Sequence, residues 1–119
     1  MSASAAVAFK ENNPRRRTPR QRVLLSGRLV MGEANAVLEC AIRNLSNFGA
    51  RVQLSDGHTT PDLVHLIEVR NGCVYRAEVV WRDYPYIGLA FLDRRDMTQE
   101  HDAADLAAYR AVWVGAQAR

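Results

Sequence analysis

The feature that most constrains the fold is a series of short segments in which apolar and polar residues alternate. In one of them Leu38, Cys40 and Ile42 share a face, and the residues between them are charged or small. The pair Asn71-Gly72 separates two such segments and is typical of a tight β-hairpin. Alternation with a period of two predicts strands with one buried face, whereas a helix needs a period near 3.6.

Six segments of this kind fill the middle of the chain. They cover Val23–Val30, Val37–Arg43, Ala50–Leu54, Leu63–Arg70, Cys73–Trp81 and Tyr86–Leu92. Six short strands with hairpin connections predict a mainly β fold, a small six-stranded antiparallel barrel. Closure into a barrel removes the free strand edges on which sheets aggregate. A chain of 119 residues is long enough for one such domain with a single core.

The period of the pattern changes near the C-terminus. There Leu106, Tyr109 and Trp113 fall at helical spacing among alanine and glutamine, which favour helices. Gly115 is a suitable helix end. We therefore expect a C-terminal helix over 96–115 that packs against the barrel.

Positive charge is concentrated at the front of the chain. Residues 1–28 hold seven basic residues and one acidic residue, whereas 29–119 hold nine basic and twelve acidic residues. Nearly all the basic residues are arginine, whose planar fork suits phosphates and base edges, although a GC-rich genome would produce the same bias. We expect a disordered N-terminal tail over 1–13 and a barrel domain over 14–95 that includes the arginine segment.

Several classes of protein do not fit this sequence. No apolar run approaches the roughly 20 residues that span a bilayer, and there is no signal-peptide pattern. Two cysteines cannot form a disulfide framework, so we expect a cytoplasmic protein. His58, His65 and His101 lack metal-ligand spacing, and no nucleophile-elbow, Walker or Rossmann pattern occurs. We therefore expect neither catalysis nor a bound metal.

Two short motifs stand out. Arg16 and Arg20 are separated by three residues just before the first predicted strand, and Asn44, Ser46 and Gly49 lie in a polar break between two strands. In this order, and followed by a β-barrel pattern, they resemble the PilZ domain family, whose motifs are Arg-x-x-x-Arg and Asp/Asn-x-Ser-x-x-Gly. The resemblance extends from residue 15 to about residue 93. It implies a six-stranded barrel that binds the bacterial second messenger cyclic di-GMP, without catalysis.

The chemistry of the motif residues fits this ligand, which carries two phosphates and two guanines. Arg16 and Arg20 can each hold a phosphate or pair with guanine O6 and N7. Asn44 can read a guanine edge, and Ser46 offers a hydroxyl. Gly49 either leaves room for a ligand close to the backbone or supplies a positive φ.

Further residues are secondary candidates. Arg15 and Arg17 can replace or reinforce Arg16, and only the spacing to Arg20 selects Arg16 from this cluster. Arg51 is expected to face outward and to add positive charge. Trp81 can stack on a guanine, but its alternation with the neighbouring inward residues favours core packing. Stacking of a guanine on an arginine of the N-terminal cluster is an equal alternative.

The sequence therefore predicts a cyclic di-GMP receptor or adaptor whose N-terminal segment changes conformation when ligand binds. It would signal to an unidentified effector protein, in the control of motility or exopolysaccharide. One alternative is a PilZ-like interaction adaptor that does not bind the ligand. Another is a small barrel that binds nucleic acid, supported by the arginine cluster and an isoelectric point near 9.2. The acidic balance of 29–119, and the lack of an evident basic and aromatic strand face, argue against that reading.

Overall fold

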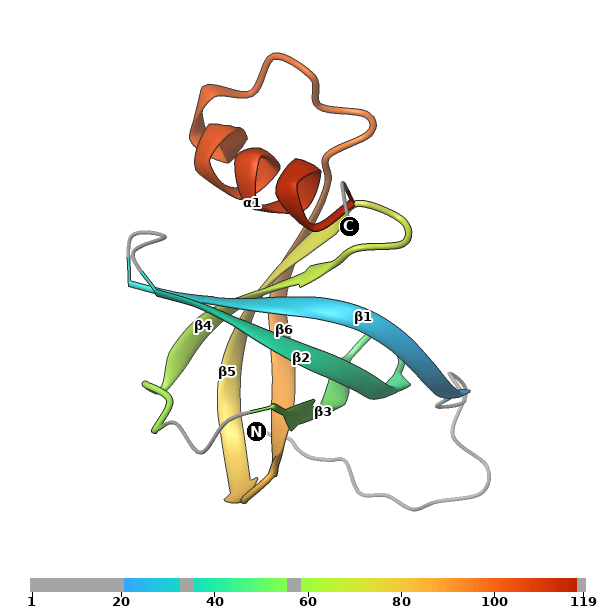
Figure 1. Cartoon of the computed structure of the whole chain (residues 1–119), viewed down its shortest axis with the longest axis vertical. Helices are drawn as coiled ribbons and strands as arrows, with labels where there is room; N and C mark the ends of the chain where they lie inside the picture. Colours follow the sequence, from blue (N-terminus) through green and yellow to red (C-terminus); the bar gives the residue numbers. More distant parts are fainter. Residues whose placement is uncertain (1–20, 33–35, 56–58, 118–119) are drawn as a thin grey trace.

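Six antiparallel strands close into a barrel in the computed structural model, which describes residues 21–32, 36–55 and 59–117 (Figure 1). The order around the barrel is β1-β2-β3-β6-β5-β4. The strands are β1 (Gln21–Met31), β2 (Ala36–Leu45), β3 (Gly49–Leu54), β4 (Leu63–Glu68), β5 (Cys73–Asp83) and β6 (Tyr86–Asp96). The predicted six-stranded barrel with a C-terminal helix is confirmed.

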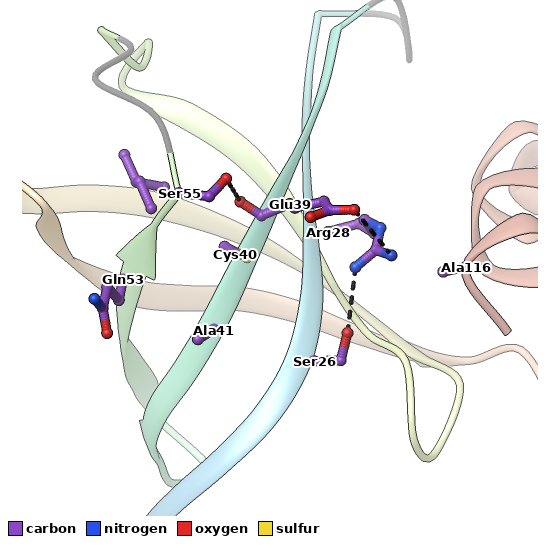
Figure 2. Close-up of a pocket in the computed structure, with 9 residues that line it drawn as sticks. Ser26, Arg28, Glu39, Cys40, Ala41, Gln53, Ser55 and Ala116 are labelled. Atoms are coloured by element: carbon purple, nitrogen blue, oxygen red, sulfur yellow. Dashed lines mark hydrogen bonds and ion pairs between the residues drawn. The ribbon is translucent and has the colours of Figure 1, made fainter. Parts of the chain in front are cut away.

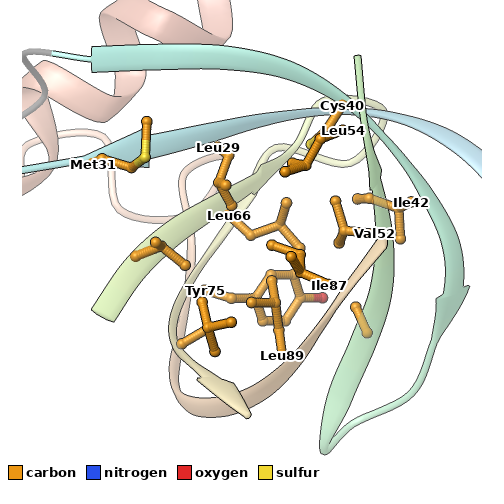
Figure 3. Packing of buried hydrophobic residues seen from close by; sticks show 14 of the residues in the cluster. Leu29, Met31, Cys40, Ile42, Val52, Leu54, Leu66, Tyr75, Ile87 and Leu89 are labelled. Atoms are coloured by element: carbon orange, nitrogen blue, oxygen red, sulfur yellow. The ribbon is translucent and has the colours of Figure 1, made fainter. Parts of the chain in front are cut away.

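The interior of the barrel is filled by the inward residues of all six strands (Figure 3). Cys40 and Ile42 are buried there and Leu38 packs against them, as their alternation predicts. Each large apolar side chain removed from water contributes about 1.5–3 kcal/mol to folding. The other members of this core include Leu29, Val52, Leu66, Tyr75, Ala77, Ile87 and Leu89.

Several strands are longer than their sequence patterns indicate, because β-bulges interrupt the alternation. The pairing of β5 with β6 shifts register between Arg76 and Ala77 and again between Val79 and Trp81. A bulge adds one residue to one strand and turns the following side chains to the other face. Trp81 is therefore 43% exposed on the outer surface, and the expectation that it packs in the core is wrong.

The C-terminal helix α1 spans Ala107–Gln117 and follows a 3-10 turn, η1 (Ala104–Leu106). Residues 96–103, expected at the start of the helix, instead end β6 and form turns. The Asp96 carboxylate accepts hydrogen bonds from the backbone N–H and the hydroxyl of Thr98, which closes the first turn after the strand. The helix also continues beyond Gly115, its expected end, to Gln117.

Helix α1 covers part of the outer surface of the barrel, and Figure 1 shows it above β1, β4 and β5. It packs on Val30, Ile67 and Val74, which are outward residues of those strands and are at most 2% exposed. The Trp113 indole N–H donates to the Val69 carbonyl at 2.8 Å, and its ring lies over Gly72. Within the ranges described above, no helix is long and apolar enough to cross a membrane.

Candidate functional site

Ser46 closes the turn between β2 and β3. Its Oγ accepts hydrogen bonds from the backbone N–H of Phe48 at 3.1 Å and of Gly49 at 3.3 Å. Its own backbone N–H donates to the Gly49 carbonyl at 3.0 Å. The Ser46 Oγ also donates to that carbonyl oxygen over 3.5 Å, at the long limit of hydrogen bonding. Ser46 therefore shapes the turn mainly as an acceptor, and its weakly held hydroxyl proton can turn to another acceptor.

Gly49 lets β3 and β6 approach closely. It pairs with Ala90, and a Cβ at this position would lie 2.1 Å from the Leu89 carbonyl oxygen. Its φ is not positive, unlike those of Gly32 and Gly72, so of the two expected reasons for a glycine here the left-handed conformation is excluded. A glycine is required here because the backbone of β6 fills the space that a side chain would take.

Asn44 lies within β2 rather than in the polar break that was expected. The pairing of β2 with β3 shifts register between Ile42 and Asn44. Ile42 and Leu45 both contribute to the interior, so the bulge places Arg43 and Asn44 consecutively on the outer surface. The Asn44 amide thereby faces outward, opposite Arg51 of β3.

A row of four residues crosses four neighbouring strands on this surface, and we call it the outer row: Asn44 of β2, Arg51 of β3, Gly88 of β6 and Trp81 of β5. Each member pairs with the next one in the sheet register. Arg22 of β1 pairs with Asn44, so the backbone register extends to a fifth strand. At a strand spacing near 4.8 Å, the outer row is about 14 Å long.

Trp81 lies flat across Gly88 at one end of the outer row. A Cβ on Gly88 would lie 2.0 Å from the Trp81 Nε1 and 2.2 Å from its Cε2, so the indole occupies the space that a side chain would take. With 43% of its surface exposed, the ring offers an aromatic face to solvent. The outer row therefore includes a flat stacking surface.

Arg51 stacks on a second aromatic ring of the same surface. Its guanidinium carbon lies 4.0 Å from the centroid of Tyr86, a cation–π contact. Tyr86 lies outside both sequence motifs. Its position in β6, two residues before Gly88, indicates that it shares the outward face of Gly88.

Arg43, also missed from the sequence, is held by an amide. Its Nη1 donates to Oε1 of Gln53 at 2.7 Å. The ion pairs of the described chain belong to other arginines, which face Glu39, Asp62, Glu100 and Asp105. Arg43 and Arg51 thus have no ion pair within the described residues, and Arg51 lies on the Tyr86 ring, so a basic and aromatic strand face exists although the sequence did not indicate one.

A polar hollow of about 520 Å³ lies beside this surface, over β1, β2 and β3 and next to Ala116 (Figure 2). Its arginine is Arg28, which donates to Ser26 Oγ at 3.2 Å and to the Gly27 carbonyl at 2.9 Å. Glu39 lies 3.8 Å from the same guanidinium. The positive charge of the hollow is thus compensated, unlike that of the outer row.

The remaining predicted residues contribute less to this surface or lie outside it. The two arginines of the first motif, Arg16 and Arg20, and the secondary candidates Arg15 and Arg17 fall outside the described residues, as does His58. No cluster of histidine, cysteine and acidic residues that could hold a metal occurs in the described part. Burial raises the pKa of the Cys40 thiol to about 12, as suits a residue of the barrel interior.

Comparison with known families places these features together. The profile of the PilZ domain family matches residues 14–109, which include both sequence motifs and the entire outer row. The resemblance seen in the two motifs is thereby confirmed. No match was found among curated proteins.

Proposed function

The chain belongs to the PilZ domain family, and on that basis we propose that it is a cytoplasmic receptor for cyclic di-GMP. The observation that carries the proposal is the outer row with its flanking groups. It presents a carboxamide, arginines that have no ion pair among the described residues, the exposed ring of Trp81 and the half-buried ring of Tyr86 on one surface. These groups match the edges, phosphates and flat faces of a guanine dinucleotide.

Each motif residue has a defined part in this proposal. Arg16 and Arg20 hold the ligand from the N-terminal side, and Asn44 pairs with a guanine edge. Ser46 donates its hydroxyl proton to the ligand, while Gly49 keeps the turn close to β6. The secondary candidates add to this: Arg15 and Arg17 supply charge, and Arg51 and Trp81 supply stacking surfaces.

Binding would connect the N-terminal segment to the barrel. The described chain begins at Gln21, which pairs with Leu45 next to Asn44, so the arginine motif enters β1 at this end of the outer row. A ligand that bridges Arg16 and Arg20 to Asn44 would change how this segment is presented. An effector protein would read the change and pass it to motility or exopolysaccharide production.

Calorimetric titration with cyclic di-GMP tests the proposal, with GTP, cyclic di-AMP and a short DNA oligomer as comparison ligands. We expect saturable binding of cyclic di-GMP alone. Arg20→Ala should weaken it by roughly 100-fold, since a charged hydrogen bond contributes about 1.5–3 kcal/mol. Arg70→Ala, an exposed arginine of the β4–β5 turn, is the matched control and should bind like the wild type. No heat with any cyclic dinucleotide would contradict the receptor and favour a ligand-free adaptor.

Nucleic-acid binding is the second candidate, because the outer surface of β2, β3, β5 and β6 combines arginine and aromatic side chains. Proteins that bind single strands use such faces. The same titration separates the two readings. Binding to the oligomer that weakens steeply with salt, and that cyclic di-GMP does not compete with, would favour this candidate.

A further inference from the structure

Arg43 and Asn44 are neighbours on the outer face because of the bulge in β2. In a regular strand Arg43, which follows the inward Ile42, would face outward and Asn44 would face the interior. The register shift after Ile42 turns Asn44 outward as well. A cation therefore stands directly beside the motif amide, at a position outside both sequence motifs.

Gln53 holds this cation without cancelling its charge. The amide oxygen accepts from Arg43 Nη1 at 2.7 Å, and Gln53 itself pairs with Ala41 on one side and Tyr86 on the other. Ordering an arginine side chain costs rotamer entropy, part of which is met here before any ligand binds. The guanidinium is thus positioned and remains a full donor for an anion.

Arg51 provides a second cation across the strand pair. It is the direct register partner of Asn44, and its guanidinium is held flat by Tyr86 at 4.0 Å. The two arginines flank Asn44, one along β2 and one across β3. Both are oriented by neutral partners, whereas Arg28, Arg82 and Arg95 face carboxylates.

We propose that Arg43 and Arg51 form a phosphate subsite on the outer surface of β2 and β3, with Gln53 as the residue that positions Arg43. This inference rests on the proposed function and assigns one phosphodiester of cyclic di-GMP to the barrel. The other phosphate is left for the arginines of the first motif. One guanine then lies over Gly88, between the subsite and Trp81, and Asn44, at the other end of the outer row, is left for the edge of the second guanine.

Two substitutions test the subsite by calorimetric titration with cyclic di-GMP. Arg43→Gln removes the cation and should weaken binding about 10- to 100-fold, as expected for a lost charged hydrogen bond. Gln53→Glu keeps Arg43 in place but pairs its charge, and should weaken binding by a similar factor while the unfolding temperature is unchanged. Arg76→Gln, an exposed arginine of β5 outside the outer row, is the control and should bind normally.

Phosphorus NMR of the bound ligand distinguishes the subsite from a merely structural contact. Bound to the wild type, the two phosphates of cyclic di-GMP should give two separate signals, and Arg43→Gln should return one of them towards its free position. If the wild type binds cyclic di-GMP and both variants bind it with the wild-type affinity, the subsite is refuted and the receptor function stands. If the wild type does not bind cyclic di-GMP, both are refuted.

Discussion

The barrel has two kinds of outer surface, and they meet on one strand, β5. Under α1 the outward residues of β1, β4 and β5 are apolar, and Val30, Ile67 and Val74 are almost fully buried. On the other side, the outer row places a carboxamide, an arginine and an indole at equivalent outward positions. β5 contributes to both surfaces, with Val74 under the helix and Trp81 in the open. The alternation of inward and outward residues therefore does not by itself tell which outward residues are covered by the helix and which are open to solvent.

The treatment of charge separates the two surfaces more clearly. Near α1, Arg95 is paired with Glu100 at 2.6 Å and with Asp105 at 2.8 Å. On the open surface Arg43 and Arg51 are held by an amide and an aromatic ring instead. Arginines paired with carboxylates fix one segment against another, whereas arginines with neutral partners can still take up an anion. The difference distinguishes a surface used for folding from the one that we propose for binding.

Removing the largest anchor of α1 should damage the covered surface and spare the open one. Trp113→Ala loses the ring over Gly72 and the hydrogen bond to Val69. We expect the free energy of unfolding to fall by about 3 kcal/mol, as for other large-to-small changes. Denaturant titration measures this loss.

Val114→Ala is the matched control, because Val114 is the next residue of the helix and its side chain is 54% exposed. It should change the free energy of unfolding by no more than about 0.5 kcal/mol. A folded Trp113→Ala protein should still bind cyclic di-GMP with wild-type affinity. Loss of binding in that protein would show that the two surfaces are not independent.

The architecture could be predicted from the sequence, because short segments of the chain specify the strands and hairpins of the barrel. The turn at Asn71-Gly72 and the alternation around Cys40 specify strands and hairpins without knowledge of their neighbours. The helix start was placed too early, since Asp96 and Thr98 form a turn that apolar spacing does not report. The strand ends beyond the bulges were missed for a similar reason.

The candidate site was less accessible from the sequence. The second motif identified Asn44, but its neighbours on the surface come from three other strands, whose register is set only when the barrel closes. One bulge reversed the expected face of Trp81, and another turned Asn44 to the outer face, on which alternation had already placed Arg43. A period-two reading fails at a bulge, and bulges are frequent next to binding sites.

Filling the space on Gly88 should disturb the open surface with a smaller effect on stability. Gly88→Ala places a Cβ where the Trp81 indole lies, so the ring must move away from the sheet. We expect a loss of about 1–2 kcal/mol in unfolding free energy, as for other overpacked sites, and weaker binding of cyclic di-GMP. Trp81 fluorescence and calorimetric titration measure the two effects.

Gly115→Ala is the matched control on the covered side, because nothing lies within 4 Å of its added Cβ. It should raise the free energy of unfolding by about 0.5–1 kcal/mol through helix propensity and leave binding unchanged. Normal binding by Gly88→Ala would remove Trp81 from the ligand surface, while the contrast in charge between the two surfaces would stand.

The smallest expected effect is a pH dependence of the covered surface. His65 of β4 contacts Tyr109 of α1, with ring centroids 4.6 Å apart and the hydroxyl 3.3 Å from Nδ1. Burial, and then the nearby charge of Arg76, lower the pKa of His65 in the folded protein. The unfolded chain therefore takes up a proton first as the pH falls through about 6.5, so the folded protein loses stability there, and the loss levels off below the folded pKa of His65.

Denaturant titrations between pH 7.5 and 5.5 should show this decrease in the free energy of unfolding, and His65→Gln should reduce it. The carboxylates near the helix do not interfere, because the ordinary pKa values of Glu100 and Asp105, 4.5 and 3.8, already lie below this pH range, and hydrogen bonds from Arg95 lower both in the folded protein. An equal slope in His65→Gln would show that His65 does not cause the pH dependence of the covered surface.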